Sequence, residues 1–118
     1  MSNTRIQRRM EALKASGRKA LIPYIVAGDP TPTVTVPAMH AIVEAGADII
    51  ELGMPFSDPF ADGPVNQRGA ERAINSGMTL TGVVKTVFEF RKDDNDTPIV
   101  LMGYLNPVIA MGETIFCE

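Results

Sequence analysis

The stretch IIELGMPFSDPFADGP, residues 49–64, decides the fold. Residues 49–52 are apolar apart from Glu51, which is typical of a strand inside a parallel sheet. The loop that follows carries three prolines and two further acids, Asp58 and Asp62. A carboxylate at the end of an apolar strand is costly to bury, so its presence there needs a structural partner or a functional reason.

Outward from this stretch, strand and helix patterns alternate along the chain. Apolar residues at helical spacing predict an N-terminal helix over residues 4–16. Strands are predicted over residues 20–27, 48–52 and 98–103; helices are predicted over 33–45, 66–76 and 79–92, with another from about Gly112 after a loop at 104–107. Pro37 conflicts with a helix that begins at Thr33, so we expect that helix to start near Val36. This alternation predicts an α/β protein with three parallel strands, crossover helices and a sheet covered on both faces.

The composition is that of a globular chain, with 45% hydrophobic residues, 21% charged residues and a net charge of −3 at pH 7. The basic residues are scattered, which argues against nucleic-acid binding. No apolar run approaches the ~20 residues that span a bilayer. Cys117 is the only cysteine, and no Cys/His cluster has the spacing of metal ligands. We therefore expect a cytoplasmic protein that contains no disulfide and no metal and has no contact with a membrane.

Glu51 is the strongest candidate for chemistry. Sites in parallel α/β folds lie at the C-terminal ends of the strands, where Glu51 is placed. Burial favours the neutral form of a carboxylate, which suits a group that exchanges protons near neutral pH. The alternative is a strand-end glutamate paired with an Arg or Lys elsewhere. Asp58 and Asp62 are open to two interpretations as well, because Asp in a proline-rich loop often only stabilises a turn.

Tyr24 and Tyr104 lie at or near predicted strand ends. They either pack in the core with the hydroxyl at the surface or form the wall of a pocket for a flat apolar ligand. His40, the only histidine, lies on a predicted helix beside Met39, and we expect it to be structural or solvated.

Three blocks of sequence carry a resemblance to a known family. They are LIPYIVAGDPTP (21–32), EAGADIIELGMPFSDPFADGPVNQ (44–67) and TPIVLMGYLNPV (97–108). In content, order and spacing they resemble the alpha subunit of tryptophan synthase. The resemblance implies a (βα)8 TIM barrel with an extra N-terminal helix, of which residues 1–118 form the N-terminal part, incomplete at the C-terminal end.

The resemblance also implies a function, the retro-aldol cleavage of indole-3-glycerol phosphate to indole and glyceraldehyde 3-phosphate. The family's catalytic glutamate and aspartate fall on Glu51 and Asp62. Residues that would line the indole pocket are Tyr24, Asn66, Met102 and Tyr104. At the position of Asn66 the family usually has an aliphatic residue, so we expect weaker packing of the indole there.

A partner is implied by the same resemblance. Pro55, Asp58 and Pro59 would face the beta subunit, which carries pyridoxal phosphate, in an assembly of two alpha and two beta subunits. The chain itself is expected to bind no cofactor. The phosphate site of such barrels is built by loops after strands 7 and 8, which lie outside residues 1–118. The alternative is therefore a truncated, inactive half-barrel that self-associates or binds the beta subunit.

Overall fold

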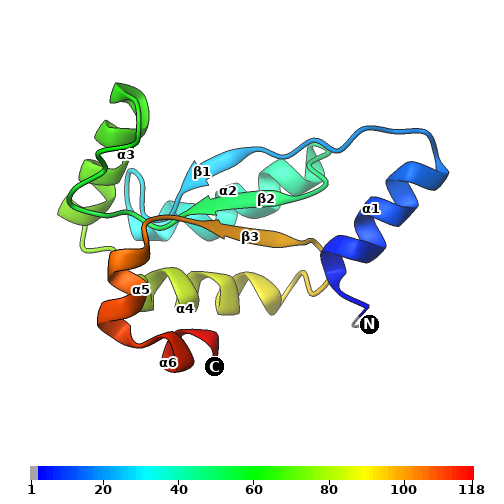
Figure 1. Cartoon of the computed structure of the whole chain (residues 1–118). Helices are drawn as coiled ribbons and strands as arrows, with labels where there is room; N and C mark the ends of the chain where they lie inside the picture. Colours follow the sequence, from blue (N-terminus) through cyan, green and yellow to red (C-terminus); the bar gives the residue numbers. More distant parts are fainter. Residues whose placement is uncertain (1–2) are drawn as a thin grey trace.

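A computed structural model describes residues 3–118, which form one three-stranded sheet with helices around it (Figure 1). The strands are β1 (Tyr24–Val26), β2 (Ile50–Gly53) and β3 (Ile99–Met102), all parallel and in the order β1-β2-β3. The helices are α1 (Arg5–Ala15), α2 (Pro32–Glu44), α3 (Pro64–Asn75), α4 (Leu80–Arg91), α5 (Leu105–Met111) and α6 (Glu113–Cys117). The predicted α/β architecture with three parallel strands and an extra N-terminal helix is confirmed.

The start of α2 differs from the prediction. The helix begins at Pro32, not near Val36, and Pro37 lies inside it. Pro32 is favourable in the first turn because backbone N–H groups there have no acceptor within the helix, so a missing N–H costs no hydrogen bond. The missing N–H of Pro37 leaves the carbonyl of Thr33 without its helical donor. Both residues are exposed, so water can satisfy that carbonyl.

The predicted loop at 104–107 is also wrong, because α5 begins at Leu105. Pro107 did not prevent this helix, since it occupies the first turn, where its N–H has no intrahelical acceptor. Gly112 ends α5 with a φ of 101° and precedes α6, so the predicted helix from this point is confirmed.

Helices cover one face of the sheet, and the expectation of two covered faces is wrong for the described residues. Ile50 and Leu52 are fully buried in a core that also contains Met39 of α2 and Phe90 of α4. Strand residues alternate between faces, and on the other face Val100 and Met102 of β3 are 41% and 40% exposed, respectively. This second face is the one that carries Glu51.

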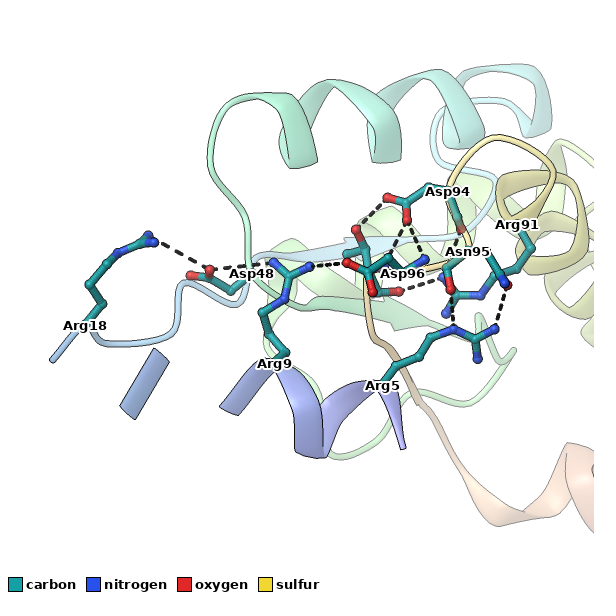
Figure 2. A network of polar contacts seen from close by, with 9 residues as sticks. Arg5, Arg9, Arg18, Asp48, Arg91, Asp94, Asn95 and Asp96 are labelled. Atoms are coloured by element: carbon teal, nitrogen blue, oxygen red, sulfur yellow. Dashed lines mark hydrogen bonds and ion pairs between the residues drawn. The ribbon is translucent and has the colours of Figure 1, made fainter. Parts of the chain in front are cut away.

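A polar network attaches α1 to the N-terminal ends of the strands, opposite the end where α3 and α5 lie (Figures 1 and 2). Asp48 is only 5% exposed, and its Oδ2 accepts a hydrogen bond from the Leu21 N–H at 2.8 Å. Arg9 of α1 and Arg18 approach the other carboxylate oxygen at 3.9 Å and 4.0 Å. This end of the sheet is thus occupied by structural ion pairs, which leaves the C-terminal ends as the place for a site.

Candidate functional site

Glu51 lies in a row of residues on the uncovered face of the sheet. The parallel register places Tyr24 of β1 on one side of it and Val100 of β3 on the other. Its strand neighbours Ile50 and Leu52 are fully buried, while Glu51 itself is only partly buried. Glu51 thus lies within β2, two residues before its last residue Gly53, on the face of the sheet that the helices leave uncovered.

Gly53 makes room for the side chain of Tyr24. A Cβ added to Gly53 would collide with the Tyr24 hydroxyl and would lie 2.9 Å from its Cζ atom. The Tyr24 ring therefore lies over the last residue of β2, two positions beyond Glu51. Glycine within a strand often marks such a close approach, and this was the signal by which the sequence alone could have identified Gly53 as part of the site.

Asp62 is brought to the same rim by a contact with Tyr104. The Tyr104 hydroxyl donates a hydrogen bond to Asp62 Oδ2 at 2.9 Å and accepts one from the Ala61 N–H, also at 2.9 Å. Tyr104 directly precedes α5, and Asp62 lies in the loop between β2 and α3. Two of the predicted site residues, 42 positions apart, are thus in direct contact.

Aromatic rings surround this hydrogen bond. The Phe60 and Phe56 rings lie 4.9 Å and 5.5 Å from the Tyr104 ring, centroid to centroid. Partial burial raises the pKa of Tyr104, and the hydrogen bond to Asp62 adds to the rise while the bond from the Ala61 N–H opposes it. The Tyr104 ring thus packs against two phenylalanines while its hydroxyl donates to the Asp62 carboxylate.

Both acids influence the pKa of Tyr24. Burial raises the pKa of the Tyr24 phenol, and the nearby charges of Asp62 and then Glu51 raise it further. A phenol resists ionisation next to negative charge. Tyr24, the first residue of β1, is thus paired in register with Glu51 and reaches over Gly53, while Tyr104 binds Asp62 beyond the C-terminal ends of the strands.

Asn66 and Met102 flank this cluster in different places. Asn66, on α3, is exposed and lines a hollow of about 240 Å³ beside the free edge of β1, together with Tyr24, Val65 and Arg72. Met102 ends β3 on the uncovered face of the sheet. The structure thus places Asn66 and Tyr24 around one hollow, while Met102 lies across the sheet from it.

The three residues predicted to face a partner all lie in the loop after β2. Asp58 is exposed, whereas Pro55 and Pro59 are partly buried. His40 is far from this loop in the fold: its ring stacks on Phe90 of α4 at 4.5 Å, as expected for a structural histidine.

Gln67 is a site residue that the sequence did not reveal. It lies in the first turn of α3, and its side-chain amide donates hydrogen bonds to the carbonyl oxygens of Asp62 at 2.8 Å and Pro59 at 3.2 Å. No sequence pattern indicates these hydrogen bonds, because a Gln in the first turn of a helix is common.

Two further features of the described residues concern metal ions and membranes. Between residues 3 and 118, no group of three or more His, Cys, Asp or Glu side chains is placed to hold a metal ion. None of the helices described above has both the length and the apolar character needed to cross a membrane.

Sequence comparisons identify relatives of this chain. The family model described as tryptophan synthase alpha chain matches residues 10–118. The tryptophan synthase alpha chain of Laribacter hongkongensis is 65% identical over 114 residues, which are 97% of this chain and 43% of the relative. That of Azoarcus sp. is 63% identical over 113 residues, which are 96% of this chain and 42% of the relative.

Solved structures give the same result. The tryptophan synthase subunit alpha of Legionella pneumophila superposes with a TM-score of 0.98 at 50% identity, over 99% of this chain and 45% of that one. A tryptophan synthase structure from M. tuberculosis gives a TM-score of 0.88 at 36% identity. The chain spans less than half the length of these relatives. It belongs to the tryptophan synthase alpha chain family and corresponds to the N-terminal part of the family's TIM barrel.

Proposed function

We propose that residues 1–118 carry the acid–base pair of a lyase of tryptophan biosynthesis, which cleaves indole-3-glycerol phosphate to indole and glyceraldehyde 3-phosphate. Glu51 and Asp62 are the two catalytic residues. The observation that supports this pairing is geometric: the sheet register places Glu51 beside Tyr24, and the Tyr104 hydroxyl after β3 holds the Asp62 carboxylate in the loop that follows β2.

The cleavage needs two proton transfers and one bond cleavage. Carbon 3 of the indole gains a proton, the side-chain hydroxyl loses one, and the bond between carbon 3 and the side chain then breaks to leave a carbonyl. Glu51 is the proton carrier for the carbon and the hydroxyl, because it lies on the face that a ligand can reach. Asp62, held by Tyr104, accepts a hydrogen bond from the indole N–H as positive charge develops on the ring.

The walls of the indole pocket are formed by Tyr24, Met102 and Tyr104, with Asn66 at its edge. Flat aromatic ligands favour pockets that combine apolar surface with a few fixed polar groups. An exposed Asn66 keeps water near the hollow beside β1, which weakens packing of an apolar ring there.

The proposed partner is a tryptophan synthase beta subunit, in an assembly of two alpha and two beta subunits located in the cytoplasm. Pro55, Asp58 and Pro59 form the contact surface on this chain. Pyridoxal phosphate belongs to that partner and takes no part in the cleavage step.

A chimera tests the proposal. Residues 1–118 replace the matching segment of the Legionella pneumophila alpha subunit, which superposes with a TM-score of 0.98. The chimera should restore growth without tryptophan to a bacterium that lacks its own alpha chain. Glu51→Gln and Asp62→Asn should each abolish that growth, while Glu44→Gln, an exposed control on α2, should not. Growth of the Glu51→Gln strain would overturn the assignment.

A second candidate function is binding without catalysis, as a half-barrel that self-associates or binds the beta subunit. The specific observation in its favour is the apolar surface around the free edge of β3, where Phe88 and Val84 are 67% and 40% exposed. Such an edge is a template for pairing with another chain. Sedimentation of the 118-residue chain should show dimers or larger species; a monodisperse monomer at high concentration would contradict this function.

A further inference from the structure

Hydrogen bonds from its side-chain amide to backbone carbonyls attach Gln67 to the loop that carries Asp62. The backbone N–H of Gln67 donates to the Gly63 carbonyl at 3.0 Å, which fixes the residue in the first turn of α3. From there its side-chain NH2 group reaches back and donates one hydrogen to the Asp62 carbonyl and one to the Pro59 carbonyl. Both ends of the segment 59–62 are therefore connected to the helix by one side chain.

Tyr104, from beyond β3, holds the same segment through other atoms. Its hydroxyl accepts from the Ala61 N–H and donates to the Asp62 carboxylate. The segment also contains a turn of its own, closed by the Asp62 N–H and the Pro59 carbonyl at 3.1 Å. The Asp62 carboxylate thus keeps its place only while the short turn 59–62 stays between α3 and the Tyr104 ring.

We propose that Gln67 is the positioning residue for Asp62: by holding the turn 59–62 against α3, it keeps the Asp62 carboxylate on the Tyr104 hydroxyl. This inference deepens the proposed function, on which its catalytic meaning rests. Gln67 touches only backbone carbonyls and acts through the loop, so it is not itself a catalytic residue. Its amide is suited to the role because one NH2 group provides both donors.

Hydrogen exchange of the Ala61 amide in the 118-residue chain tests the proposal without any turnover. Tyr104→Phe removes the acceptor of that amide and sets the exchange rate of the unbonded state. Gln67→Ala should raise the rate by about fivefold, the equivalent of one ordinary hydrogen bond, toward the Tyr104→Phe value. Gln67→Glu is close in shape but has no donor, and it should behave like Gln67→Ala. Asn75→Ala, at the far end of the same helix, is the matched control and should leave the rate unchanged.

Either of two exchange results would overturn the proposal: an Ala61 rate in Gln67→Ala equal to that of the parent chain, or a Gln67→Glu variant that behaves like the parent. Kinetics of the chimera add a second readout. Gln67→Ala should lower kcat by about tenfold with KM within twofold, the split expected when a group needed in the transition state is misplaced. If Gln67→Ala raised the exchange rate but left kcat unchanged, the two hydrogen bonds of the Gln67 amide would not serve catalysis. That result would also overturn the assignment of Gln67 as a positioning residue. An inactive parent chimera would count against the proposed function alone, because the exchange rates would still decide the role of Gln67.

Discussion

Replacing Asp48 by Ala should destabilise the chain more than any other removal of a carboxylate near α1. Asp48 is 5% exposed, and its Oδ2 accepts the Leu21 N–H at 2.8 Å. The Ala variant loses this hydrogen bond and leaves the N–H without its acceptor. The carboxylate connects the segment before β1 to the start of β2, so the loss acts on the central strand of the sheet.

The magnitude follows from the contacts. A hydrogen bond to a charged group contributes about 1.5–3 kcal/mol. The ion pairs with Arg9 and Arg18 add little, because they are 3.9 Å and 4.0 Å long and Arg18 is 65% exposed. We therefore expect Asp48→Ala to lower the free energy of unfolding by about 2–3 kcal/mol. Asp48→Asn keeps an oxygen acceptor and should cost about 1 kcal/mol.

Urea unfolding followed by circular dichroism measures these differences. Asp96→Ala is the matched control: its side chain is 82% exposed and pairs with the same Arg9 at 3.3 Å, so its loss should cost less than about 0.5 kcal/mol. Equal losses in the free energy of unfolding for Asp48→Ala and Asp96→Ala would refute the reasoning. Burial of Asp48 and its hydrogen bond to Leu21 would then contribute nothing to stability.

Other perturbations have equally definite outcomes. Gly53→Ala places a Cβ against the Tyr24 ring and should cost about 1–3 kcal/mol in urea unfolding; Gly63→Ala, where a Cβ meets nothing within 4 Å, should cost less than about 1 kcal/mol, and the reverse order would contradict the packing. Burial and nearby carboxylates raise the pKa of Tyr24, and burial first of all raises that of Tyr104, so absorbance at alkaline pH should show both phenols ionising above 10.0. Because the folded state then holds these protons more tightly than the unfolded chain, the free energy of unfolding should fall as the pH rises above about 10; phenols that titrate at or below 10.0 would contradict this. Burial alone would raise the pKa of Asp94, but hydrogen bonds from the side chain and backbone of Thr97 and from the Asp96 amide outweigh it and lower that pKa below 3.8. The free energy of unfolding should therefore fall as the pH drops below about 3.8, and it should fall less steeply in Asp94→Asn.

Local patterns were enough to predict the elements of the fold. The apolar run ending at Glu51 and the helical spacing of apolar residues identify β2 and the helices to within a few residues. The errors in the helix boundaries occurred at prolines, because the sequence does not say whether the missing N–H of a proline would have had a helical acceptor. Pro37 is tolerated on an exposed side of α2, and Pro107 falls in a first turn.

The site could be predicted only in part. Position near the end of an apolar strand makes Glu51 a candidate, and the loop makes Asp62 a second one, but nothing local links Asp62 to Tyr104. That contact depends on how β3 lies beside β2, which brings together residues 42 positions apart. The role of Gln67 was hidden for the same reason, since its acceptors are backbone carbonyls, which every residue has.

The central claim is that Glu51 carries the proton transfers of the cleavage. Its most direct test is the rate of indole release from indole-3-glycerol phosphate by the purified chimera, beside its Glu51→Gln variant. General acid–base catalysis typically contributes about 10²–10⁴-fold, so kcat should fall by at least about a hundredfold while the variant stays folded. A Glu51→Gln chimera that releases indole at the parent rate would contradict the account.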